Sequence, residues 1–412
     1  MSEAGEVGEA SGGWVRHAGV AGAAVGLLAA GVAVERLTVN RTVRRRARAE
    51  LDTSGPYGSL RGEPGTVVAA DGTELYYEVD EPVEAPQPVI EGEPATSGVD
   101  PEVAAAVRHA GCTVVFSHGY CLSQDVWHFQ REALRGSVRT VYWDQRSHGR
   151  SGRSQPGERM SIDRLGGDLR AVLDAAAPEG PIVLVGHSMG GMTMMALADQ
   201  YPEYVAQRVS GVAFLGTSAG GLGEVTYGLP AVGAKAVRRV VPGILSALAG
   251  QAELVERSRR ATAELFAVLV RRYSFGRPRE VDSAVARFAQ RLIESVPVDV
   301  VADFYPAFTE HEKSAALGAF GGIPALVLAG DRDQITPYAH SEAIAAELPE
   351  AALTTVVRAG HLVMLECPEL VDTELAALLA RTIRKHGKTA QGTARADSAG
   401  RRADRSPHRS DP

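Results

Sequence analysis

The stretch that decides the fold is Pro181-Ile182-Val183-Leu184-Val185-Gly186-His187-Ser188-Met189-Gly190, followed by the apolar run 192–198. The run 181–185 is typical of a buried strand, and the run 192–198 is typical of a helix. Ser188 therefore lies on a sharp turn that projects its Oγ outward, with a glycine on each side because a Cβ there would collide with the strand or the helix. The helix behind Ser188 directs free N–H groups toward the place where negative charge would develop.

The composition is that of a globular protein, and it excludes several kinds of partner. The chain has 412 residues, of which 45% are hydrophobic and 23% are charged, so it can form one large domain with an insertion, or two domains. A net charge of −7 provides no basic surface for nucleic acid. The three cysteines are too few and too scattered for a disulfide framework, and no metal-binding motif is present. We therefore expect no metal, no cofactor and no nucleic-acid partner.

Residues 1–64 fall into three segments of different composition. Residues 1–17 form a polar leader, residues 18–34 carry no charge, and residues 35–64 form a basic linker. The uncharged segment is short for a bilayer span, and the arginines after it would keep the rest of the chain in the cytoplasm. We predict a single membrane anchor with the body on the cytoplasmic face, or a cytoplasmic protein in which segment 18–34 packs on the body. Export is the least favoured alternative, because a signal peptide carries its positive charges before the apolar run.

Short apolar runs alternate with helical patterns in two parts of the chain, residues 65–220 and residues 321–386. The first part begins with a hairpin pattern around Asp71-Gly72, and residues 80–108 are typical of a loop. Strands that alternate with helices predict a mainly parallel sheet with helices on both faces. We therefore assign both parts to one α/β core.

A helical pattern interrupts this core. Residues 221–320 show helical periodicity and no strand pattern, so we predict a helical cap over the carboxyl edge of the sheet. The core ends in a predicted helix from Pro368 to about Lys385. Residues 387–412 are polar and poor in apolar side chains, which predicts a disordered tail.

Five motifs, each after a predicted strand, make the chain resemble the α/β-hydrolase family. They are His118-Gly119, the loop Asp144-x-Arg146-x-His148-Gly149-x-Ser151, the turn at Ser188, Asp333 ahead of Pro337, and Gly360-His361, with Glu366-x-Pro368 behind it. The resemblance covers residues 65–385 and implies an α/β-hydrolase fold with a helical cap. A serine in the turn, where epoxide hydrolases and haloalkane dehalogenases have aspartate, argues against those relatives.

The resemblance implies a catalytic triad in the chain order serine, aspartate, histidine. Ser188 is the expected nucleophile and His361 the expected base, because a serine hydroxyl is a weak nucleophile near neutral pH. The spacing in the family selects Asp333 as the acid that orients His361, with Asp331 as the alternative. The backbone N–H groups of Tyr120 and Met189 are expected to form the oxyanion hole.

Several nearby polar residues are expected to have structural roles. We expect Thr336 to cap the helix that follows it, and Glu366 to brace the start of the last helix. His148 is the rival base, although its loop is structural in the family. Ser147 stands where the family commonly has glycine, which raises a question about the backbone angles of that turn.

Together these features predict a serine hydrolase that cleaves a carboxylic ester through an acyl-enzyme on Ser188. Lipid-like esters are favoured by a cap rich in apolar residues and by the candidate anchor at residues 18–34. The same triad would serve a thioesterase, a lactonase, a carbon–carbon hydrolase or a haloperoxidase-like perhydrolase, and a non-catalytic binding protein of this fold is the alternative outside the enzymes. The expected partner is a small-molecule ester, and the oligomeric state is left open.

Overall fold

The computed structural model describes residues 56–83, 100–155, 159–225, 239–240, 243 and 267–403, with residues 386–403 described by their backbone alone. The predicted anchor at residues 18–34 lies outside these ranges. Among the described residues, no helix has the length and apolar character needed to cross a bilayer.

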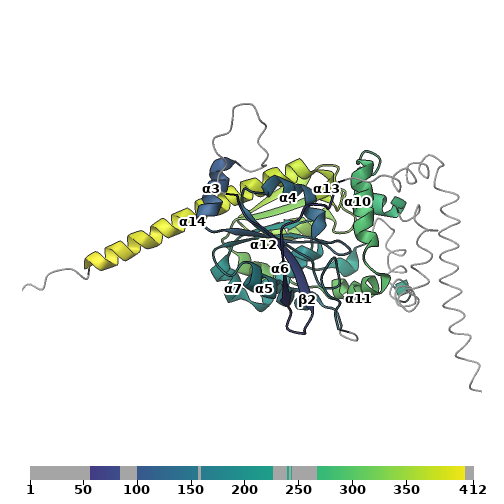
Figure 1. Cartoon of the computed structure of the whole chain (residues 1–412), viewed down its shortest axis with the longest axis horizontal. Helices are drawn as coiled ribbons and strands as arrows, with labels where there is room; N and C mark the ends of the chain where they lie inside the picture. The colour runs from purple at the N-terminus through teal and green to yellow at the C-terminus, as the bar shows by residue number, and fades with distance from the viewer. Residues whose placement is uncertain are drawn as a thin grey trace, which may run out of the picture.

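An eight-stranded sheet forms the centre of the protein (Figure 1). Its strands are β1 (Glu63–Val68), β2 (Glu74–Asp80), β3 (Thr113–Ser117), β4 (Arg139–Trp143), β5 (Ile182–His187), β6 (Val209–Leu215), β7 (Ala325–Gly330) and β8 (Ala351–Val356). Their order is β1-β2-β4-β3-β5-β6-β7-β8. The six strands from β4 to β8 are parallel, whereas β1 and β2 are antiparallel to their neighbours. The predicted sheet is confirmed.

Helices cover both faces of the sheet, as its apolar strands require. One face packs against α3 (Pro101–His109), α4 (His128–Leu134), α13 (Val363–Glu366) and α14 (Pro368–Ala403), and α10 (Ser283–Glu294) joins the same apolar cluster. The other face packs against α5 (Ile162–Ala176), α6 (Met189–Gln200), α7 (Pro202–Arg208) and α12 (Tyr338–Glu347). Within the described residues between β6 and β7, the chain forms a helical stretch at residues 267–274, α10, α11 (Val298–Thr309) and two 3₁₀ helices, Leu222–Glu224 and Ser314–Phe320.

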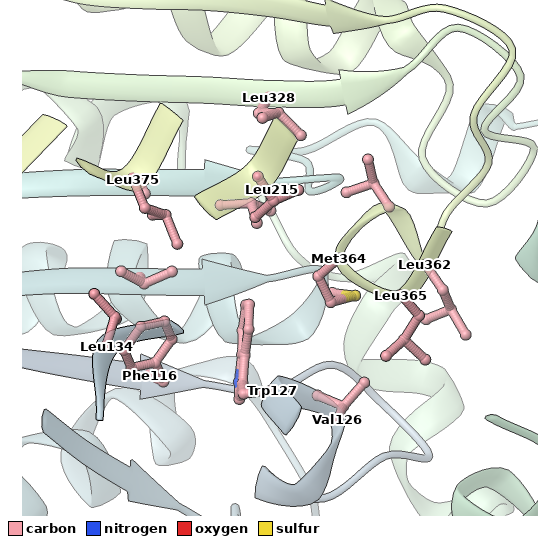
Figure 2. Close-up of a cluster of buried hydrophobic side chains, with 14 of the residues drawn as sticks. Phe116, Val126, Trp127, Leu134, Leu215, Leu328, Leu362, Met364, Leu365 and Leu375 are labelled. Carbon is pink, nitrogen blue, oxygen red and sulfur yellow. The ribbon is translucent and has the colours of Figure 1, made fainter. Parts of the chain in front are cut away.

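The core on the first face reaches the end of the sheet where the candidate site residues lie. Figure 2 shows Phe116, Leu215 and Leu328 from the sheet together with Trp127 and three residues that follow His361. Those three are Leu362, Met364 and Leu365. Because they are buried in this cluster, the chain segment that carries His361 is anchored in the core.

Helix α11, which lies in the predicted cap, packs against α6, the helix behind Ser188. A third apolar cluster contains Val300, Phe304 and Ala307 of α11 together with Met189 and Met192 of α6. The cluster therefore places one face of the cap directly against the first turn of α6.

Two predictions about the first half of the core have different outcomes. The hairpin is confirmed, since β1 and β2 pair across a turn in which Gly72 has φ 88°. The loop predicted for residues 80–108 is wrong at its end, where α3 begins at Pro101. The Asp100 side chain accepts hydrogen bonds from the first N–H groups of α3, and proline is favoured at the first helical position. Both signals were present in the sequence.

Both ends of the described chain also depart from expectation. The basic linker was predicted to reach residue 64, but Tyr57 already packs against the rings of His128 and Phe288. The disordered tail was predicted from residue 387, but α14 continues to Ala403. Residues 386–403 contain no proline, and their five alanines and three arginines favour helix.

The loop after β4 depends on a buried arginine, Arg146. Arg146 is 1% exposed and donates to both carboxylate oxygens of Asp168, at 2.5 and 2.6 Å, and to Asp71 at 2.5 Å. Ser147 has φ 62°, so this residue does adopt the left-handed conformation that glycine favours.

We expect Arg146→Leu to lower the free energy of unfolding by about 3–5 kcal/mol, because it leaves the buried Asp168 carboxylate without its partner. The matched control is Arg159→Leu, which removes an ion pair between exposed Arg159 and Glu310 and should cost at most about 1 kcal/mol. Urea denaturation followed by circular dichroism measures both changes. Equal losses in the two variants would contradict this account of the loop.

Candidate active site

Ser188 lies between β5 and α6 in a strained conformation. Its φ is 52° and its ψ is −117°, which non-glycine residues rarely adopt. The Ser188 N–H donates to the Leu215 carbonyl at 3.0 Å, and the Thr217 hydroxyl donates to the Ser188 carbonyl at 2.6 Å. Gly190 is required here, because a Cβ on it would lie 2.1 Å from the Ser117 carbonyl oxygen. The predicted turn and the reason for its glycine are both present.

Asp333 and His361 form a hydrogen-bonded pair. The His361 Nδ1 lies 2.8 Å from Asp333 Oδ2, and both residues are almost fully buried. Asp333 also accepts from the N–H groups of Ile335 and Thr336, at 2.8 and 3.0 Å, and from the Thr336 hydroxyl at 2.8 Å. These donors fix the carboxylate in one orientation and leave it able to hold the imidazole.

The pair lies at the same end of the sheet as Ser188. Gly216 follows β6, and a Cβ on it would lie 3.3 Å from Asp333 Oδ2 and 3.6 Å from His361 Nδ1. His187, the residue before Ser188, has its Nε2 3.0 Å from the His361 carbonyl oxygen. Within the described residues, Ser188 Oγ makes no hydrogen bond, which is common for nucleophiles without a bound substrate. The fold therefore places Ser188 at the same end of the sheet as the Asp333–His361 pair.

A cavity of about 210 Å³ opens beside Ser188. Its walls are mainly apolar and aromatic, and they come from the sheet edge, from α6 and from α11. They include Tyr120, Met192, Leu222, Tyr305, Phe308 and Ile335, together with Ser188 and Thr336. Such a site can take an apolar group and hold it against the serine.

The predicted oxyanion residues are close to this cavity. Tyr120 lines it, and Met189 is the first residue of α6, where an N–H has no partner within the helix. The loop after β3 is fixed by His118, whose Nε2 accepts from the Gln145 N–H at 2.9 Å. Its Nδ1 lies 2.7 Å from the Gly119 carbonyl oxygen and is therefore the donor. His118 thus shapes the loop.

Comparison with known proteins agrees with this geometry. The sequence model of the alpha/beta hydrolase fold matches residues 113–368, well over half of the chain. The chain belongs to the α/β-hydrolase fold family. That range contains Ser188, Asp333, His361, Tyr120 and Met189.

The proteins and solved structures that resemble this chain have diverse names. The chain is 27% identical over 278 residues to the dihydrolipoyllysine-residue acetyltransferase component of the acetoin cleaving system of Pseudomonas putida, covering 67% of this chain and 64% of that protein. It is 30% identical over 237 residues to the monoacylglycerol lipase of Mycolicibacterium smegmatis, covering 55% of this chain and 72% of that protein. A solved esterase from Thermogutta terrifontis matches with a TM-score of 0.55 at 23% identity, over 78% of this chain and 99% of that one, which shows the shared fold.

Two other histidines of this α/β hydrolase, His148 and His187, are unsuited to act as the base. His148 Nε2 accepts from the Cys121 N–H at 3.2 Å, and its Nδ1 lies 2.9 Å from the Arg146 carbonyl oxygen, so both ring nitrogens are used. Its pKa is lowered to about 3, mainly by burial and secondly by His118. His187 is also fully buried, which lowers its pKa well below the usual value.

Three further residues have clear positions. Asp331, the alternative acid, accepts from the Arg358 N–H at 2.6 Å and serves a turn. Thr336 does not cap α12, which has no side-chain cap and begins after Pro337, because its hydroxyl donates to Asp333 instead. Glu366 was expected to brace the start of α14, and that prediction is wrong.

Glu366 instead joins the His361 loop to Gly276 and Arg277, which precede α10. Its carboxylate accepts from the N–H groups of Gly276 and Arg277, both at 2.9 Å, and of Gly360 at 2.8 Å. Three backbone N–H groups converge here, so the carboxylate satisfies buried donors of two loops rather than the end of a helix. Among the described residues, no cluster of acidic, histidine or cysteine side chains is arranged to hold a metal.

The buried histidines predict a pH-dependent stability. Because the pKa of His148 is about 3 in the folded chain and about 6.5 in the unfolded chain, the unfolded chain takes up the proton first as pH falls. The contribution of neutral His148 to the free energy of unfolding is therefore fully present above about pH 6.5 and is lost as the pH falls toward 3. We expect His148→Gln to reduce the slope of unfolding free energy between about pH 6 and pH 4 by roughly 1.4 kcal/mol per pH unit. Exposed His109→Gln is the control; urea titrations with the same slope in all three proteins would contradict the expectation.

Proposed function

We propose that this α/β hydrolase is a serine hydrolase that cleaves carboxylic esters through an acyl-enzyme on Ser188. The observation that carries the proposal is the 2.8 Å hydrogen bond between Asp333 and His361 beside the strained turn that presents Ser188. A strained nucleophile, a base and an acid that orients the base are the three parts of this chemistry.

The proposed reaction has two halves. His361 Nε2 takes the proton of Ser188 Oγ as the oxygen attacks the acyl carbon, and the proton then passes to the departing alcohol. In the second half, His361 takes a proton from water, the resulting hydroxide attacks the acyl carbon, and the proton returns to Ser188. Asp333 keeps Nδ1–H of His361 as a donor and stabilises the imidazolium. The N–H groups of Tyr120 and Met189 stabilise the oxyanion in both halves.

The walls of the cavity support an apolar acyl group as the part of the substrate that is recognised. Met192, Leu222, Phe308 and Ile335 offer no charge with which to bind a carboxylate or an ammonium group. Its volume of about 210 Å³ is below the range of about 300–1,000 Å³ typical of sites for drug-sized ligands. We therefore propose acyl esters of modest chain length as the substrate class, which is in keeping with the lipase named among the relatives.

Labelling with a fluorophosphonate, measured by intact mass, tests the proposal. We expect one adduct on the wild-type protein and none on Ser188→Ala.

Asp333→Asn should lower kcat for an ester by roughly 10³–10⁴-fold, because it destroys the orientation of the imidazole. The matched control Asp331→Asn should leave kcat almost unchanged, since Asp331 is bonded to Arg358 in a turn. A folded wild-type protein that takes no label, or equal losses in the two asparagine variants, would contradict the proposed roles.

A further inference from the structure

The side chain of Tyr120 connects the oxyanion loop to the cap. Its hydroxyl donates to the Val301 carbonyl of α11 at 2.6 Å. Its ring lies 4.8 Å from the ring of Phe308 and 6.0 Å from that of Phe304, both of α11. Burial raises the pKa of this hydroxyl well above its ordinary value, so it remains a donor. One residue thus carries a proposed oxyanion N–H and a tether to a different element.

The backbone next to Tyr120 needs such a tether. Cys121 has φ 57°, a strained conformation that persists only where surrounding contacts hold it. The core supplies two of these contacts, from the Cys121 N–H to His148 and from His118 to the Gly119 carbonyl. The Tyr120 hydroxyl supplies a contact from the cap. The direction of the Tyr120 N–H therefore depends on where α11 lies.

Helix α11 can accept this bond without losing one of its own. Pro306 lies inside the helix and has no N–H, so the carbonyl that lacks a helical donor is that of Ala302, next to Val301. A carbonyl oxygen has two lone pairs, so Val301 can accept from the Tyr120 hydroxyl in addition to a helical N–H.

The same helix forms a wall of the cavity beside Ser188. Tyr305, Phe308 and Thr309 of α11 line the cavity, as do Tyr120 and Ser188. A group that fills the cavity must pack on α11 and on Tyr120 together, and it thereby holds the hydroxyl, the helix and the oxyanion loop in one arrangement.

We propose that Tyr120 is a positioning residue that couples acyl-group binding on α11 to the oxyanion hole, so that a longer acyl group raises kcat as well as affinity. This inference rests on the proposed ester hydrolysis. It concerns the rate of deacylation, in which only the acyl group is still bound. Without the hydroxyl, the ring can pack as before, but α11 no longer fixes the N–H.

The test compares Tyr120→Phe with wild type on p-nitrophenyl acetate, butyrate and hexanoate. In wild type we expect kcat to rise with acyl length. In Tyr120→Phe we expect kcat on hexanoate to fall about three- to tenfold, the range for loss of one hydrogen bond, with KM little changed. The dependence of kcat on acyl length should flatten. Tyr338→Phe is the matched control, because among the described residues the Tyr338 hydroxyl on α12 is hydrogen-bonded only to the exposed Thr355 hydroxyl, at 2.5 Å.

Two further measurements separate the possible outcomes. Pro306→Ala supplies the N–H that the Ala302 carbonyl lacks and so shifts the turn of α11 beside Val301 without touching Tyr120. It should flatten the dependence of kcat on acyl length in the same way, even if Tyr120→Phe folds poorly by thermal unfolding. A kcat that does not rise with acyl length in wild type, or that rises equally in Tyr120→Phe, overturns the coupling while leaving the esterase proposal intact. A wild-type protein that hydrolyses none of the esters and takes no fluorophosphonate contradicts the proposed function itself, and the coupling with it.

Discussion

The close approach of α6 to β3 is the constraint on which the site depends. At Gly190 the space for a side chain is already filled by the Ser117 carbonyl, so the first turn of α6 can lie this deep only with glycine there. The approach keeps the Met189 N–H and the loop that carries Tyr120 close to each other. It also forces Ser188 into its strained conformation, which the bonds to Leu215 and Thr217 then maintain.

The parallel order of the strands places the loops that carry the other site residues. The carboxyl ends of β3, β5, β6 and β7 meet at one edge of the sheet, and the loops that leave this edge carry Tyr120, Ser188 and Asp333. His361 reaches the same edge after β8, and its loop is held by the buried residues that follow it and by Glu366. Residues far apart in the sequence are thus brought together mainly by backbone pairing, and the side chains only adjust their orientation.

Much of this could be predicted from the sequence, because local signals decide it. Apolar runs gave the strands, and glycines on both sides of Ser188 gave the turn. The role of Asp333 over Asp331 followed from spacing in the family, since the residues alone left both open. The failures have physical causes: α3 was missed although Asp100 and Pro101 are good start signals, and Glu366 binds backbone donors from a loop whose position only the fold decides. The Tyr120–Val301 hydrogen bond joins residues 181 positions apart, so no local sequence pattern predicts it.

The central claim is that Ser188 forms a covalent acyl-enzyme, and rapid-mixing kinetics with acid quench tests it most directly. A p-nitrophenyl ester should release a burst of p-nitrophenol equal to the enzyme concentration when deacylation is the slower half. Peptide mapping of the quenched protein should then find the acyl mass on Ser188. An acyl group on another residue, or turnover in which neither a burst nor a trapped acyl group can be found, would contradict the account.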